Sequence, residues 1–177
     1  MVKPILLVAG AIPAIVALLI LVPLITKPDI PFSAANPNDT IEIEYTKHQL
    51  SKVSFGITDK VSSQKTEILL IKNNGEMKYS VIKEGYAQPE IESELNDEKL
   101  LKLTALIKET GFIAIPSESF PVMENVTEYQ KSNVKVTLNG AIKQIHWPQQ
   151  NATTKFIPPI IAMVESELDA IVEQIRE

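Results

Sequence analysis

Residues 129–147 read YQKSNVKVTLNGAIKQIHW and predict a β-hairpin. Apolar and polar residues alternate along positions 134–138, as expected of a strand with one buried face. Asn139 and Gly140 then form the two-residue turn that such hairpins prefer, because both residues tolerate a positive φ. Strands joined by so short a turn must be antiparallel neighbours in one sheet.

A second hairpin is predicted upstream, where residues 66–82 read TEILLIKNNGEMKYSVI. Residues 73–75 (NNG) supply its turn between two β-rich runs. Two short alternating runs before it, residues 41–45 and residues 50–57, predict early strands. Residues 83–95 are rich in glutamate and are interpreted as a polar loop.

Each hairpin is followed by a predicted helix. Asn96 is a good N-cap for the first helix, and Gly111 is a natural residue just after its end. Pro158-Pro159 can open the second helix at its first turn. An apolar stripe at helical spacing follows, formed by Ile157, Ile161, Val164, Leu168, Ile171 and Ile175.

These elements predict an α+β fold: an antiparallel sheet with two helices packed on one face, preceded by one N-terminal transmembrane helix. Residues 113–128 are expected to form a long surface loop, since they contain two prolines and several acids. The other face of the sheet is expected to be partly in contact with water.

The transmembrane helix is predicted at residues 4–25, which contain no charged residue and match the roughly 20 apolar residues that a bilayer requires. The expected organisation is an anchor at residues 1–27, a Pro- and Asn-rich linker at residues 28–40 and an extracytoplasmic domain at residues 41–177. A cleaved signal peptide is the alternative, although its apolar region is usually only about 7–15 residues long.

The topology that we expect is a short cytoplasmic tail, a single pass through the cell membrane and a C-terminal domain outside the cytoplasm. Three candidate N-glycosylation sequons agree with it, at Asn38, Asn125 and Asn151, all of which lie after the anchor. A three-residue sequon is short enough to arise by chance, so the state in which none is glycosylated remains the alternative.

Charge and composition exclude several classes of function. Without Lys3 and Lys27, 15 basic and 22 acidic residues remain, which gives residues 28–177 a net charge of −7. Nucleic-acid binding needs a positive surface, so we expect no nucleic-acid partner. The absence of cysteine excludes disulfides, thiolate catalysis and zinc–thiolate sites.

No catalytic, metal or cofactor-binding residue is predicted, and the chain is not expected to be an enzyme. His48 is interpreted as part of a polar turn. His146 is interpreted as an exposed residue on the strand face opposite to the face that carries Ile145 and Trp147. Neither histidine has a local carboxylate or serine partner. The acids of residues 83–95 lack the spacing of a calcium loop, so a solvated surface is expected there.

The chain resembles the emfourin family of small domains that inhibit thermolysin-type metallopeptidases. The resemblance covers about residues 50–177 and rests on Phe55-Gly56, on the capped helix followed by residues 111–116 (GFIAIP), and on the Asn139-Gly140 hairpin before a proline-led helix. Ile113 stands where the family often has a second aromatic residue. The resemblance implies a hairpin-helix-hairpin-helix domain with inhibitor-like function.

Three functional hypotheses remain open at the sequence level. The first is a membrane-anchored protein-interaction domain without catalytic activity, held by the lipid bilayer around residues 4–25. It would present residues 83–95 and 113–128 to an unknown protein partner. The second is an accessory subunit of a membrane protein complex. The third is a hydrolase whose acids converge only in the folded chain.

Overall fold

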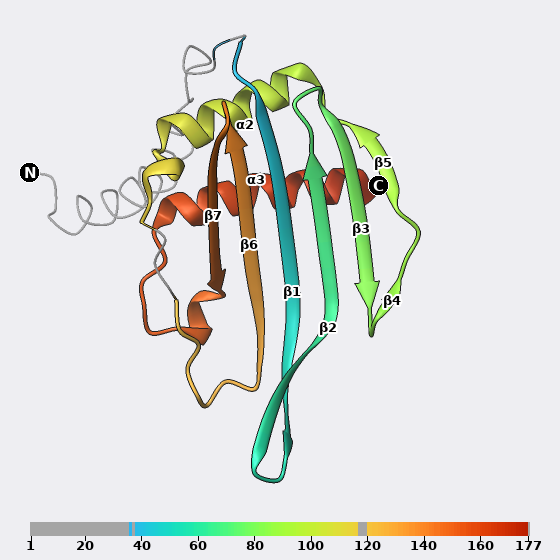
Figure 1. The fold of residues 1–177 in the computed structure, drawn as a ribbon, viewed down its shortest axis with the longest axis vertical. Helices are drawn as coiled ribbons and strands as arrows, with labels where there is room; N and C mark the ends of the chain where they lie inside the picture. Colours follow the sequence, from blue (N-terminus) through green and yellow to red (C-terminus); the bar gives the residue numbers. More distant parts are fainter. Residues whose placement is uncertain (1–35, 37, 117–119, 177) are drawn as a thin grey trace, which may run out of the picture. The chain divides into compact units, whose positions relative to one another are not determined.

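The computed structural model describes residues 36, 38–116 and 120–176. They form an α+β fold in which one antiparallel sheet is covered on one face by two helices (Figure 1). The strand order is β4-β3-β2-β1-β6-β7, and β5 also pairs with β3. The strands are β1 (Ile41–Phe55), β2 (Thr58–Ile71), β3 (Glu76–Lys83), β4 (Tyr86–Ala87), β5 (Ile91–Glu94), β6 (Glu128–Leu138) and β7 (Ala141–Pro148). The helices are α2 (Asp97–Glu109) and α3 (Pro159–Arg176), with short 3₁₀ helices η2 (Phe112–Ala114) and η3 (Gln150–Ala152).

The prediction of an antiparallel sheet with two helices on one face is therefore confirmed. The predicted transmembrane helix at residues 4–25 and most of the linker lie outside the described residues. In the part of the chain that is described, neither helix combines the length and the apolarity that crossing a bilayer requires.

Strand β1 is central and longer than the sequence suggested. Residues 41–45 and 50–57 were expected to form separate strands, but one continuous strand runs from Ile41 to Phe55. The residues between the two predicted runs pair with β2 on one side and β6 on the other. Ladder hydrogen bonds on both sides hold this polar stretch in the sheet, although its side chains show no clear alternation.

The two predicted hairpins are present. Asn139 and Gly140 have φ values of 50° and 81°, as a type I′ turn requires. Gly75 has a φ of 83°, and a Cβ atom there would lie 2.6 Å from the carbonyl oxygen of Leu95, so only glycine fits. The prediction of a polar loop at residues 83–95 was wrong, since this segment contains β4 and β5, which both pair with β3.

Both helices begin where predicted. The side-chain oxygen of Asn96 accepts a hydrogen bond of 2.8 Å from the Lys99 amide at the start of α2, and Gly111 just after that helix has a φ of 68°. α3 begins at Pro159. Its apolar stripe faces the core, with Ile157 half-buried and the other predicted members buried: Ile161, Val164, Leu168, Ile171 and Ile175.

Helix α3 lies across the strands, and two of its carboxylates form hydrogen bonds with residues of three strands. Glu165 accepts hydrogen bonds from Ser132 of β6 (2.5 Å) and Trp147 of β7 (3.0 Å). One helical turn later, Asp169 accepts a hydrogen bond of 2.7 Å from Tyr45 of β1. Burial, then the hydrogen bond to Asp169, raises the pKa of Tyr45 well above its ordinary value. The helix is thus fastened to three strands by carboxylates that flank its apolar stripe.

Candidate functional site: the β1–β2 arm

The two segments that were expected to be presented to a protein partner border different strands of the sheet. Residues 83–95 border β3, whereas residues 113–128 lead into β6. Strands β2 and β1 lie between β3 and β6 in the sheet, so about 14 Å of strand spacing separates the two borders. The hypothesis that both segments are presented to a protein partner stays a prediction.

A different feature protrudes from the sheet, and sequence patterns did not single it out. Strand β1 pairs with β6 only as far as Ser51, and β2 pairs with β3 only from Lys65 onward. Residues 52–64, here called the arm, are therefore a two-stranded ribbon that extends beyond the neighbouring strands (Figure 1). Its register pairs Lys52 with Val61 and Val53 with Lys60.

The arm is fastened to the domain at its base. The Lys52 amide donates a hydrogen bond of 2.7 Å to the carbonyl oxygen of Thr127, and the Glu84 amide donates one of 2.9 Å to that of Gln64. The β1–β2 register shifts here, because Gln49 pairs with Lys65 but Leu50 pairs with Ser63. Such a bulge increases the local twist. The arm therefore leaves the sheet in a defined direction.

The tip is a tight turn. Gly56 has a φ of 68°, and Ile57 is not among the residues with positive φ. Glycine with positive φ at the first of two central positions is the pattern of a type II′ turn, whose twist matches that of a hairpin. Ile57 therefore occupies the second central position, at the far end of the ribbon.

Apolar side chains on the arm face water. Val53 is 41% exposed, Ile57 104% and Val61 49%. An isolated two-stranded hairpin is marginal in water because it has no third strand or helix to pack against. Val53 pairs with Lys60 and Val61 with Lys52, so the two valines lie on opposite faces of the ribbon, and Ile57 lies at its tip. Exposed apolar side chains grouped on such an element are typical of a contact surface.

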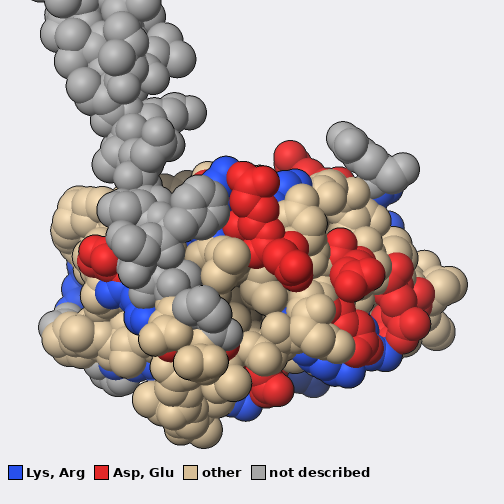
Figure 2. All heavy atoms as spheres, turned by 90° about the horizontal axis from the view of Figure 1, so that it is seen from above, with Lys and Arg blue, Asp and Glu red and all other residues tan. Residues whose placement is uncertain are grey.

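Charge is distributed unevenly along the long axis of the sheet. The arm carries Lys52, Asp59 and Lys60, which gives it a net charge of +1 within an acidic chain. Figure 2 views the domain from the end opposite the arm and shows acidic side chains gathered there. The exposed acids near the start of α2 are Glu94, Asp97 and Glu98. A partner of the arm would therefore meet an apolar, weakly basic surface.

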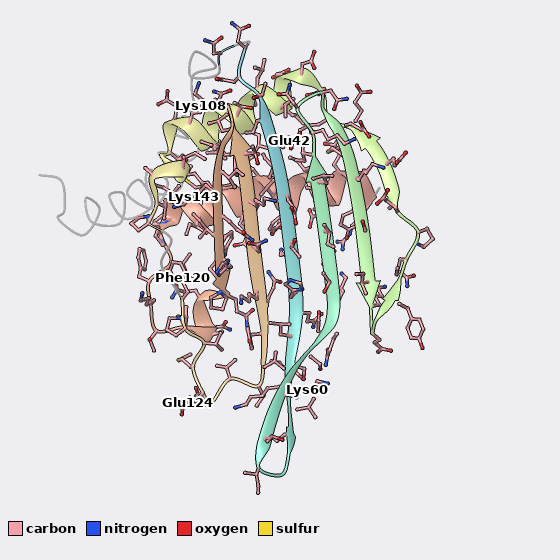
Figure 3. All side chains as sticks on the ribbon, viewed as in Figure 1. Glu42, Lys60, Lys108, Phe120, Glu124 and Lys143 are labelled. Carbon is pink, nitrogen blue, oxygen red and sulfur yellow. The ribbon has the colours of Figure 1, made fainter. Side chains whose placement is uncertain are left out.

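Part of the predicted 113–128 loop lies beside the arm. The ammonium of Lys52 is 3.5 Å from the carbonyl oxygen of Glu124, and the Met123 amide donates a hydrogen bond of 2.9 Å to Ala152 of η3. Figure 3 labels Glu124 next to the base of the arm and Lys60 on it. This half of the predicted surface therefore contributes to the same end of the domain.

The histidines do not form a recognisable catalytic group. His48 is a half-buried residue of β1 and not part of a polar turn, because pairing continues through it on both sides. Its Nδ1 lies 2.9 Å from the Thr66 hydroxyl, which is 2.9 Å from that of Ser63. Burial, then the charge of Lys131, lowers the pKa of His48. Thr66 is buried, so the histidine contacts a hydroxyl that water does not reach, and the exposed Ser63 lies one hydrogen bond further away.

His146 is exposed while Ile145 and Trp147 are buried, as predicted. Among the described residues, no three His, Asp or Glu side chains are grouped to hold a metal ion. Glu90 and Glu92 instead contact Lys78, at 3.3 and 2.5 Å.

The three asparagines of the candidate sequons, Asn38, Asn125 and Asn151, are exposed. No protein-family model and no curated protein sequence matches this chain.

Proposed function

We propose that the chain is a membrane-anchored, extracytoplasmic domain without catalytic activity, and that it binds another protein through its arm. The proposal is supported chiefly by the exposure of Val53, Ile57 and Val61 on a ribbon that has no third strand. Burial against a partner would remove their apolar surface from water, at about 25 cal/mol per Å². It would also give the ribbon the packing that it lacks by itself.

The tip of the arm lies far from the point where the chain enters the domain. Residues 38–40 lead into β1 at the end of the strand far from the tip. At about 3.3 Å per residue, a 15-residue strand places the tip about 50 Å from Ile41. The chain that comes from the predicted anchor at residues 4–25 therefore joins the domain at the opposite end. We expect the tip to contact a protein partner.

The resemblance to emfourins suggests a more specific version of this function, an inhibitor of a thermolysin-type metallopeptidase. Phe55-Gly56, one of the features on which the resemblance rests, forms part of the arm's tip turn. A narrow ribbon with an apolar tip is suited to entering a protease cleft. We expect the full chain to inhibit such a peptidase and the variant Ile57→Asp to inhibit it much less. Full peptidase activity at a molar excess of the chain would reject this version.

A photo-cross-linking residue in place of Ile57 tests the general proposal in native membranes. Ile142 provides a matched control, since it is also an exposed isoleucine (67%) but lies on β7. We expect a cross-linked product of defined mass from position 57 and none from position 142. The product should disappear when Val53 and Val61 are both changed to serine. Equal cross-linking from both positions, or none from position 57, would contradict a contact surface on the arm.

A further inference from the structure

A small pocket lies at a different place in the domain, at the edge of the sheet beside β3. It has a volume of about 240 Å³ and opens between β2, β3, the β4–β5 segment and the last turn of α3. Its apolar wall is formed by Val81, Pro89 and Ile91, and its polar lining by Lys65, Tyr79, Lys83, Gln88 and Arg176. The pocket thus combines an apolar wall with three cationic side chains, those of Lys65, Lys83 and Arg176.

The positive charges of this pocket are only partly balanced. Lys65 and Lys83 lie directly opposite each other on β2 and β3, and like charges in that position destabilise a strand pair. Glu67 is 2.9 Å from the Lys65 ammonium and also contacts Arg176. The side chain of Lys83 has no hydrogen bond or ion pair with any residue that the structure describes, although its backbone pairs within the sheet. One carboxylate therefore faces three cations.

Arg176 is held in a fixed orientation that leaves donors free. Its Nε donates a hydrogen bond of 2.9 Å to the Tyr79 hydroxyl, and its Nη2 contacts Glu67. Burial, followed by the hydrogen bond to Glu67, raises the pKa of Tyr79 to about 12. The hydroxyl therefore keeps its proton and donates a hydrogen bond to Glu67. Within the described chain, the Nη1 group of Arg176 has no partner. Two guanidinium N–H groups are thus available to an anion.

We propose that this pocket binds a small organic carboxylate with an apolar body. The guanidinium of Arg176 matches a planar carboxylate, and Lys83 supplies a second charge. The apolar wall favours an organic body over a bare inorganic anion. A volume of about 240 Å³ is below the roughly 300–1,000 Å³ of pockets for drug-sized ligands, so the ligand is the size of a small metabolite or a single peptide terminus.

The probe for this site is N-acetyl-L-leucine, which combines a carboxylate with a branched apolar side chain. Titration of the full chain in mild detergent, followed by amide NMR, should give saturable shifts at Val81, Gln88 and Ile91. The neutral N-acetyl-L-leucinamide and inorganic phosphate lack the charge and the apolar body, respectively. We expect each to bind about tenfold more weakly or worse. Absence of shifts at these amides, or equal binding of the neutral amide, would overturn the proposal.

Substitution of Lys83 distinguishes a binding role from a structural one, because this side chain makes no contact that the fold requires. Lys83→Gln should weaken N-acetyl-L-leucine binding about tenfold and leave the unfolding midpoint unchanged or slightly raised, since it removes the like-charge pair. Lys135→Gln, on β6 and 3.6 Å from Glu44, is the matched control and should bind as the unaltered chain does. Unchanged affinity in Lys83→Gln would contradict the proposed site.

A free metabolite and the C-terminus of a protein would present the same chemistry. A peptide ending in leucine with a free carboxylate distinguishes them from each other. Tighter binding of this peptide than of N-acetyl-L-leucine would support a protein terminus as ligand, and weaker binding would support a small molecule. The pocket lies away from the arm, so failure of either proposal leaves the other intact.

Discussion

The two halves of strand β1 differ in how deeply their apolar side chains are buried. In its first half, Ile41, Ile43 and Tyr45 are at most 2% exposed, whereas Val53 in the second half is 41% exposed. Both halves alternate apolar and polar residues. The difference arises because helices cover the first half, whereas beyond Ser51 the strand pairs with β2 alone and no described element covers it (Figure 1). Alternation therefore predicts a strand, but only the covering elements decide whether its apolar face is core.

The largest expected effect comes from the covered half. Ile43→Ala removes a fully buried side chain and should destabilise the domain by about 2–5 kcal/mol. Urea unfolding followed by the fluorescence of Trp147, the only tryptophan, measures the change. A loss below about 1 kcal/mol would contradict the position of this residue in the core.

A smaller effect is expected where α3 is fastened to the sheet. Glu165→Ala leaves the buried Trp147 indole N–H and the Ser132 hydroxyl without their acceptor, which should cost about 1–3 kcal/mol. Glu167→Ala removes an exposed acid from the same helix and serves as control. The account of how α3 is held fails if the two variants unfold at the same urea concentration.

The end of the sheet opposite the arm should respond to acid. Hydrogen bonds from Lys108, then Asn139, lower the pKa of Asp39 from 3.8 to about 2. Because the pKa is lower in the folded state, this contribution to stability is present above pH 3.8 and is lost as the pH falls towards about 2. The stability difference between the unaltered chain and Asp39→Asn should therefore shrink over that range. A difference that is constant with pH would show that Asp39 is not paired.

The smallest effect on stability is expected from the arm itself. Ile57→Ser should change the free energy of unfolding by less than about 0.5 kcal/mol, since the side chain is fully exposed. Ile43→Ala on the same strand pair provides the contrast. A loss comparable to that of Ile43→Ala would mean that Ile57 is part of the domain's own core and not a contact residue.

The parts of the fold that sequence predicted well are those set by a few adjacent residues. Asn139-Gly140, Asn96 and Pro159 each fix a turn or a helix start through their own backbone preferences. The arm could not be predicted in this way. Its limits depend on where β6 and β3 stop pairing with β1 and β2, and residues 62–64 (SSQ) have no alternation that marks a strand.

The pocket beside β3 depends on register in the same way. Lys65 and Lys83 are 18 positions apart, and only the strand pairing places them opposite each other. His48 was assigned to a turn because its neighbours are polar, and long-range pairing again decided otherwise. In this chain, local signals determine the turns and caps, and non-local pairing determines the candidate sites.

Amide hydrogen exchange of residues 52–64 tests the central claim most directly, by comparing the purified full chain with the same chain in native membranes. A ribbon without a third strand should exchange rapidly when purified, and contact with a protein partner should slow its exchange. We predict protection in native membranes that is confined to the arm and adjoining residues 120–128. Rapid exchange of the arm in both samples, with protection elsewhere on the domain, would contradict the account.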